Sequence, residues 1–310
     1  MAGTHGARIA VVGSLMMDLV VRVPRPPAIG ESLIGRDFQT FTGGKGANQA
    51  VAAARLGAEQ VAIIGRIGDD DFGRRIVRTL EEEGIDCRGI IRDRRHGTGV
   101  AIPIVYDDGR NSIISVPQAN LALSAGDIRA MSALIAEAEM VLIQFEVGLD
   151  AVAAALAVAA EADVPVLLNA APVVQHASHL LTQAAHLVLN EVEAAAFAPY
   201  AGGDHLAEAR YLLGDGTDTV VVTLGEDGAL LAQPNRMHVI SPFVVEAVDT
   251  VGAGDAFCAA YAVGLTSGMG VVEAAQFAAA AGALAVTKQG AQTALPTRTA
   301  VEGVLRGTVT

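Results

Sequence analysis

The chain has 310 residues, enough for a single large α/β domain or for two ordinary domains. Its 21 Lys and Arg residues against 34 Asp and Glu residues give a net charge of −13, which argues against nucleic acid or an acidic membrane surface as a partner. The apolar runs are shorter than the roughly 20 residues that a membrane-spanning helix needs. The first residues lack the apolar core of a secretory signal, and Cys87 and Cys258 form no CxxC pair, so we expect a cytoplasmic protein.

Short apolar runs alternate with longer Ala- and Leu-rich segments. We predict strands at 9–12, 61–64, 140–143, 166–168, 187–189 and 220–223, and helices near 47–56, 73–83, 151–162 and 205–213. Near-continuous apolar strands separated by helices favour a mostly parallel sheet covered on both faces. The sequence therefore predicts an α/β fold with three layers, αβα, in a single domain over residues 1–310.

Two stretches break this rhythm. Residues 18–34 and 97–115 alternate apolar and polar side chains, as antiparallel strands do, and residues 107–109 read as a turn. We expect them to form one small sheet from excursions at about 18–40 and 97–117. Such a sheet over a ligand cleft would act as a lid.

Residues 249–257 read Asp-Thr-Val-Gly-Ala-Gly-Asp-Ala-Phe and are predicted to lead from a strand into an apolar helix. The small residues Gly252, Ala253 and Gly254 let backbone N–H groups converge at the helix start, where they can hold a phosphoryl group. Asp255 would then accept a proton from an attacking hydroxyl. The alternatives are an ordinary turn with an acidic first helical turn, or a dinucleotide fingerprint, which lacks its third glycine here.

Residues 42–50 read Thr-Gly-Gly-Lys-Gly-Ala-Asn-Gln-Ala. The glycines permit close approach of a ligand, and Lys45 and Asn48 provide donors. The segment is not a Walker A loop, because Gly46 stands where Ser or Thr should follow the lysine. By itself it could be a turn that opens a helix.

Together, the two segments make the chain resemble the ribokinase family, also called the PfkB carbohydrate kinases, from residue 11 to about 296. Both signatures are present, in this order and some 200 residues apart. The resemblance implies an ATP-dependent sugar kinase with an αβα domain and a sheet lid, and the edges of the lid suggest a homodimer in which two lids pair.

The resemblance also assigns roles to matching positions. Asp255 would be the general base, and the amides of Gly252, Ala253, Gly254 and Asp255 the anion hole. Contacts to the sugar would come from Met16, Asp18, Gly43, Gly44, Lys45, Asn48, Glu146 and Asp255. Contacts to ATP would come from Asn190, Thr223, Leu224, Gly225, Glu226, Asp227, Gly228, Gly254 and Ala279. Glu193 would contact Mg²⁺ through water, and a K⁺ site would be formed by Asp249, Val251, Ala285, Lys288, Gly290 and Ala294. Ala294 departs from the hydroxyl residue that is common in the family, which weakens the K⁺ expectation.

The substrate is suggested by residues 13–18, Gly-Ser-Leu-Met-Met-Asp. Ribokinases proper have a Gly-Ser-x-Asn-x-Asp pattern there, and Met16 replaces the amide that would pair with a sugar hydroxyl. Met at this position resembles the deoxyribokinase branch and favours 2-deoxy-D-ribose, phosphorylated at its 5-hydroxyl, with ribose as a poorer substrate. Ribose or another pentose, a nucleoside and a ketohexose remain alternatives.

Two other classes of function remain open at this point. A non-catalytic sugar sensor should have lost Asp255 or its neighbouring glycines, and neither is lost. A dehydrogenase would bind NAD and give no ATP-dependent product. His176 and His179 share a helical face, but no nearby carboxylate or cysteine completes a metal site.

Overall fold

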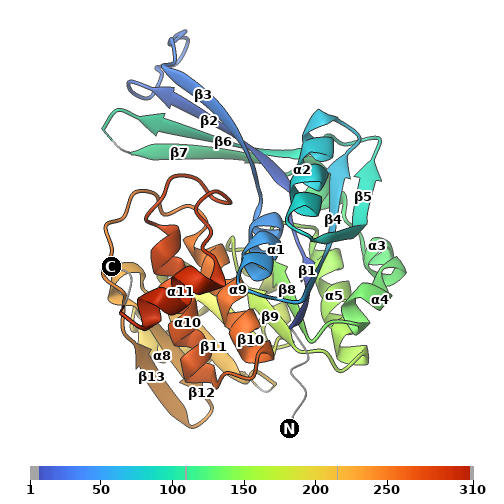
Figure 1. Ribbon diagram of the computed structural model, residues 1–310, viewed down its shortest axis with the longest axis vertical. Coiled ribbons are helices and arrows are strands. Elements are labelled where there is room, and N and C mark those ends of the chain that lie inside the picture. Colours follow the sequence, from blue (N-terminus) through green and yellow to red (C-terminus); the bar gives the residue numbers. More distant parts are fainter. Residues whose placement is uncertain (1–6, 109, 215, 308–310) are drawn as a thin grey trace.

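The alternating strands and helices assemble into one nine-stranded sheet with helices on both faces, and a separate four-stranded sheet projects from it (Figure 1). The computed structural model describes residues 7–108, 110–214 and 216–307. In the larger sheet the strand order is β13 (Arg236–Ile240), β12 (Ala229–Gln233), β11 (Thr219–Thr223), β10 (His186–Asn190), β9 (Val166–Asn169), β8 (Met140–Gln144), β1 (Arg8–Val12), β4 (Gln60–Gly68) and β5 (Asp86–Asp93). The strands from β11 to β5 are parallel, whereas β12 and β13 form an antiparallel extension.

Both faces of the larger sheet are apolar because each central strand buries consecutive side chains. In β1, Ile9 and Val11 point into one core and Ala10 and Val12 into the other. The first face carries α1 (Lys45–Arg55), α2 (Asp71–Glu82), α9 (Ala253–Thr266), α10 (Val271–Ala285) and α11 (Arg298–Leu305). The second face carries α3 (Ala125–Ala130), α4 (Ser132–Ala136), α5 (Leu149–Glu161), α6 (Ser178–Leu181), α7 (Glu191–Phe197) and α8 (His205–Leu212). Helix α1 packs directly against α9, so two segments far apart in the sequence lie side by side.

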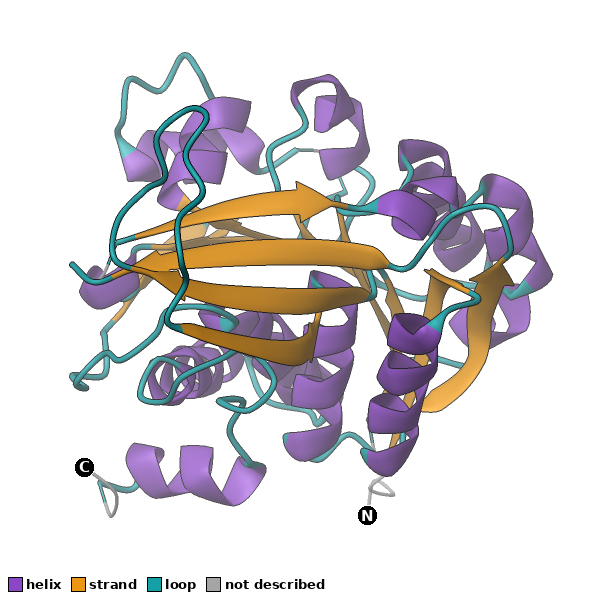
Figure 2. Ribbon diagram, turned by 90° about the horizontal axis from the view of Figure 1, so that it is seen from above, coloured by secondary structure: helices purple, strands orange, loops and turns teal. Residues whose placement is uncertain are grey.

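The smaller sheet has the order β3 (Asp37–Gly43), β2 (Met16–Val23), β6 (Gly99–Tyr106) and β7 (Asn111–Val116). Strand β2 pairs antiparallel with β3 and parallel with β6, so the two expected excursions of the chain do meet in one sheet. Seen from above, its strands lie across the molecule (Figure 2). The strand predicted over 18–34 was too long. It ends at Val23, and residues 24–36 contain no strand. Of the predicted turn, Gly109 lies outside the described residues.

One prediction about the main sheet was wrong. No strand precedes Asp249, because β13 ends at Ile240 and residues 241–252 form neither helix nor strand. Their apolar side chains, which suggested a strand, instead line a cavity beside α9 and α10. Strand β5 and the hairpin of β12 and β13 were not predicted, and both lie at edges of the sheet. Within the described residues, no helix is long and apolar enough to span a bilayer.

Candidate active site

The predicted site residues follow the carboxyl ends of parallel strands. These strand ends lie together on one side of the larger sheet. Strand β1 ends at Val12 before Met16 and Asp18, and β8 ends at Gln144 before Glu146. Loops at this edge of an open α/β sheet are where ligands bind in general, because no helix covers the strand ends. Helices α1 and α9 complete the site from the first face of the sheet.

Glu146 is held at the start of α1. The helix begins after Gly44, which has a φ of 90°, and a Cβ at this position would lie 2.9 Å from the Met16 nitrogen and 2.9 Å from the Ser14 oxygen. Glycine is therefore required by conformation and by space. The Lys45 amide donates to Oε2 of Glu146 at 3.1 Å, and the Ser14 hydroxyl donates to the same oxygen. The carboxylate thus caps the helix while its other oxygen remains available to a ligand.

Asp255 lies in the first turn of α9, which begins after Gly252 in the left-handed conformation at a φ of 83°. In this turn, the amide of Ala256 bonds the Gly252 carbonyl at 2.8 Å. The amides of Gly254 and Asp255 have no partner among the described residues, as expected at a helix N-terminus. Such free N–H groups and the helix dipole favour an anion here.

The Asp255 carboxylate is buried and receives two side-chain amides from α1. Asn48 Nδ2 donates to Oδ2 at 2.9 Å, and Gln49 Nε2 donates to Oδ1 at 3.1 Å. Burial raises the pKa of Asp255, although Lys45 and the two amides act in the opposite direction. A buried carboxylate with a raised pKa is a stronger proton acceptor than an ordinary aspartate, which suits a general base.

The carboxylates of Asp18, Glu146 and Asp255 and the ammonium of Lys45 lie close together, and we call this group the carboxylate pocket. Burial, and then the charges of Glu146 and Asp255, raise the pKa of Asp18 to about 7. Burial lowers the pKa of Lys45, but Asp255, Glu146 and Glu193 outweigh it and raise the pKa overall. Lys45 therefore stays charged, and the cluster presents acceptors and one strong donor to a polyhydroxylated ligand.

The register of the smaller sheet determines which side chains face this pocket. Met16 pairs with Gly43 on β3 and with Gly99 on β6, and Asp18 pairs with Ala101 on β6. Residues two positions apart in a strand lie on the same face of its sheet, so Met16 lies on the same face as Asp18. The Met16 side chain is buried, and a Cβ placed on Gly43 would lie 2.3 Å from Oδ2 of Asp18.

A cavity of about 700 Å³ opens beside Gly254. Most of the residues predicted to contact ATP line it: Thr223, Gly225, Glu226, Asp227, Gly228, Gly254 and Ala279. Leu224 and Asn190 do not line the cavity. Phe243 and Val245, from the segment before Asp249, and Phe257 supply apolar walls suited to a flat ring. The cavity and the carboxylate pocket thus meet at the first turn of α9.

Asn190 and Glu193 form a reciprocal cap at the start of α7. The Glu193 amide donates to Oδ1 of Asn190 at 2.8 Å, and the Asn190 amide donates to Oε2 of Glu193 at 2.9 Å. Burial raises the pKa of Glu193. Sequence reasoning placed both residues near a metal ion and missed this structural role, which the spacing of three residues also indicates.

The predicted K⁺ residues come from two loops that the structure brings together. Asp249 accepts from the Val251 amide at 3.1 Å and from the Gly290 amide at 2.9 Å. The Asp249 amide also bonds the Val286 carbonyl, just after Ala285 ends α10. Lys288 and the buried Ala294 belong to the same second loop. Over the described ranges, no group of three or more His, Cys, Asp or Glu side chains forms a metal cluster, and His176 and His179 remain a pair without further ligands.

Gln49, Gln144 and Asn169 were not among the predicted site residues, although Gln49 lies in the glycine-rich motif. All three are buried and linked to Asp255 by hydrogen bonds. Their polarity in an apolar surrounding was the available signal, since a buried amide needs partners.

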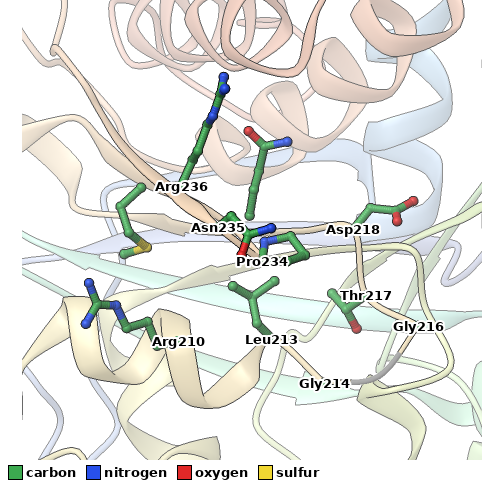
Figure 3. Close-up of a pocket in the computed structure, with 11 residues that line it drawn as sticks. Arg210, Leu213, Gly214, Gly216, Thr217, Asp218, Pro234, Asn235 and Arg236 are labelled. Atoms are coloured by element: carbon green, nitrogen blue, oxygen red, sulfur yellow. The ribbon is translucent and has the colours of Figure 1, made fainter.

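A second cavity of about 810 Å³ lies between α8 and the turn of β12 and β13 (Figure 3). It is lined by Arg210, Leu213, Thr217, Asp218, Asn235 and Arg236, among others, and by none of the predicted site residues. Asp218 precedes the first residue of β11, so this cavity lies at the amino ends of the strands, whereas Asp255 lies near their carboxyl ends.

The sequence profile of the "pfkB family carbohydrate kinase" matches residues 7–298. The chain belongs to this family. It is 39% identical to a ribokinase of Bacillus subtilis over 301 residues, 96% of this chain and 99% of that protein. It is 37% identical to a ribokinase of Haemophilus influenzae over 94% of this chain and 95% of that protein, and 36% identical to a deoxyribokinase of Salmonella typhi over 93% and 95%.

Solved structures agree with this assignment. A ribokinase from Thermotoga maritima superposes with a TM-score of 0.89 at 34% identity, covering 97% of this chain and 99% of that one. A ribokinase of Arabidopsis thaliana, solved with ribose and ATP, gives 0.89 at 30% identity over 97% and 99%. The predicted family and fold class are therefore confirmed, and this pfkB protein is an ATP-dependent carbohydrate kinase rather than a dehydrogenase.

Proposed function

We propose that this kinase phosphorylates the 5-hydroxyl of a pentose, and that it prefers 2-deoxy-D-ribose over D-ribose. The observation that carries the preference is the position of Met16. Its side chain is buried on the same face of β2 as Asp18, between Gly43 and Gly99. The relatives leave the choice open, because ribokinases at 37% and 39% identity and a deoxyribokinase at 36% are nearly equidistant.

A thioether beside the sugar changes the balance between the two substrates. A sugar hydroxyl buried against Met16 without a partner would cost about 1–3 kcal/mol. A methylene in the same place would gain about 0.8 kcal/mol. Since an apolar pocket rejects an added hydroxyl by only about a hundredfold, ribose should remain a slow substrate.

In the proposed reaction, Asp18, Lys45, Asn48 and Glu146 hold the sugar and present its 5-hydroxyl to Asp255. Asp255 removes the hydroxyl proton as the oxygen attacks the γ-phosphoryl group of ATP. The free amides of Gly254 and Asp255 stabilise the negative charge of the transferring group. ATP lies in the cavity of about 700 Å³ that opens at Gly254.

Two metal ions fit the residues present. Glu193 uses Oε2 in the cap and has Oε1 free of hydrogen bonds to the described residues, so it can hold a water of Mg²⁺. Mg²⁺ would neutralise charge on the ATP phosphates. A K⁺ ion would be held by the loops of Asp249 and Gly290, where it would brace the start of α9.

The smaller sheet is proposed to close over the sugar and to pair with the same sheet of a second copy. Phe38 and Ile114, on the lid strands, expose 60% and 52% of their surface. A homodimer through these strands would cover them. Sedimentation should give a dimer mass for the native protein and a monomer mass for Ile114→Asp; a monomeric native protein would contradict this assembly.

The substrate proposal is tested by kcat/KM for 2-deoxy-D-ribose and D-ribose, measured with ATP, Mg²⁺ and K⁺. The native enzyme should prefer deoxyribose, Met16→Asn should reverse the preference, and Met16→Leu should keep it because it restores no amide. An unchanged ratio in Met16→Asn would show that Met16 does not select the sugar. Turnover of neither pentose would exclude both and direct the search to nucleosides and ketohexoses.

A further inference from the structure

A chain of buried amides connects the ends of two central strands to the carboxylate of Asp255. Gln144, the last residue of β8, donates from Nε2 to Oε1 of Gln49 at 2.6 Å. Gln49 Nε2 donates to Oδ1 of Asp255 at 3.1 Å and to Oδ1 of Asn169 at 3.3 Å. Asn169, the last residue of β9, is itself fixed by a bond from Nδ2 to the Val188 carbonyl at 3.1 Å.

We propose that Gln49 is a positioning residue that fixes the orientation of the Asp255 carboxylate and leaves Oδ2 as the oxygen that accepts the proton. This inference rests on the proposed role of Asp255 as the general base. It extends that role to an amide that is fully buried and does not line the cavity beside Gly254.

The orientation of the Gln49 amide is determined by its neighbours. Both N–H groups of Nε2 are used, by Asp255 and Asn169, and Oε1 accepts from Gln144. If the amide were turned around, its oxygen would face the carboxylate of Asp255 and Oδ1 of Asn169, which are both repulsive contacts. The network therefore has one favourable polarity, and Gln49 always presents a donor to Asp255.

Asn48 and Gln49 hold the two oxygens of Asp255 in different ways. Gln49 is fully buried, so its bond to Oδ1 persists whether or not a sugar is bound. Asn48 lies among the sugar-binding residues, and its Oδ1 is buried without a partner in the described structure. A hydroxyl that enters the pocket can satisfy this atom and compete with the bond to Oδ2. Oδ2 is thus the oxygen that can be released to the substrate.

The Gln49 bond also affects basicity. An N–H donated to the ionised carboxylate favours the charged form, so its removal should raise the pKa of Asp255 further. The charged or titratable groups that act on Asp255 are Lys45 on α1, Glu146 after β8, Asp18 on β2, Glu193 on α7 and Cys258 on α9 itself. None of these is altered by a change at position 49.

The test uses Gln49→Met, which has similar length and no amide, in the full enzyme. We expect kcat to fall by about 10- to 100-fold and KM for the sugar to change by less than about twofold. The acid limb of the kcat profile should move up by about one pH unit, since the base must be ionised. Gln49→Glu, which places a second carboxylate against Asp255, should move it further.

Tyr261→Phe is the matched control. It removes a buried hydrogen bond from α9 to Thr219, at 3.1 Å and at the opposite edge of the sheet, and should leave kcat and the pH profile unchanged. If Gln49→Met is poorly folded, Gln144→Met should give the same direction of change with a smaller size.

An acid limb that stays in place in Gln49→Met would overturn the positioning role. The same holds if kcat falls equally in Tyr261→Phe. Failure of the base assignment is a separate outcome: it would appear as near-normal turnover in Asp255→Asn, whatever Gln49→Met does.

Discussion

Asn48 Nδ2 donates to Oδ2 of Asp255 at 2.9 Å across 207 positions of sequence. The bond joins the first turns of α1 and α9, which pack side by side on the same face of the sheet. Each helix begins after a glycine with positive φ, Gly44 and Gly252. The two glycine-rich motifs therefore form one site, in which the residues expected to hold the sugar touch the expected base.

Asp255→Asn should lower kcat by several orders of magnitude with little change in sugar affinity. The amide keeps the shape of the side chain and cannot accept the hydroxyl proton. Steady-state turnover and equilibrium binding of the sugar measure the two effects separately. Asp163→Asn, at an exposed position in the turn after α5, is the matched control and should behave like the native enzyme.

Asp18 should make sugar binding depend on pH near neutrality. Its pKa is raised to about 7, and the ionised carboxylate accepts bonds at both oxygens, whereas protonation turns one of them into a donor. KM for the sugar should therefore rise as the pH falls from 8 to 6, by up to about tenfold. Asp108→Asn, on the exposed lid hairpin, should keep this dependence. A flat KM profile would mean that Asp18 is ionised throughout.

The same carboxylate should destabilise the free enzyme at alkaline pH. Because the folded-state pKa of Asp18 lies above its unfolded value of 3.8, its stabilising contribution is present below about pH 4 and is lost as the pH rises through about 7. At pH 8, Asp18→Asn should increase the free energy of unfolding by an amount on the order of 1 kcal/mol, and its Tm should exceed that of the native protein. Calorimetry at pH 5 and pH 8 would show it; an equal effect at both would contradict the linkage.

Gly44→Ala should cost more stability than Gly84→Ala. Both glycines have positive φ, at 90° and 76°, where an L residue costs about 1–2 kcal/mol. A Cβ at position 84 meets nothing within 4 Å, whereas one at position 44 is 2.9 Å from two backbone atoms. Denaturant unfolding should separate the two variants, and only Gly44→Ala should also weaken sugar binding. Equal losses would mean that the backbone at 44 can relax.

Glu193→Gln and Glu193→Ala should separate the two roles of this residue. Gln can still accept from the Asn190 amide, so the cap should survive while the charge is lost. We expect Glu193→Gln to keep its Tm and to require more Mg²⁺ for half-maximal activity. Glu193→Ala should also lose about 1 kcal/mol of stability. Unchanged Mg²⁺ dependence in both would limit Glu193 to its structural role.

The central strands, helices α1, α2, α5 and α8 and the second sheet were predictable because each has strong hydrophobic periodicity. Edge strands such as β5 were not, since residues like Arg88 and Arg92 obscure the apolar pattern. The strand expected before Asp249 was a wrong prediction, because apolar residues such as Phe243 and Val245 that line a cavity read like those of a strand.

For the site, the motifs named Lys45, Asn48 and Asp255, but not the amides behind them. Gln144 and Asn169 stand at the ends of ordinary buried strands. What brings them to Gln49 is the order of the strands, which no local pattern reveals. The reciprocal cap of Asn190 and Glu193 was readable from spacing alone, but the resemblance to the family drew attention to the metal instead.

Because α9 packs against α1, the candidate active site cannot form during synthesis until α9 has been made. Until residue 255 has left the ribosome, Gln49 and Asn48 have no carboxylate to bind, and the first face of the sheet lacks three of its helices, α9, α10 and α11. Nascent chains that stop before α9 would thus expose apolar strand surface, the kind of surface that chaperones bind. The proposed sugar site therefore depends on the last fifth of the polypeptide, although most of its residues come from the first half.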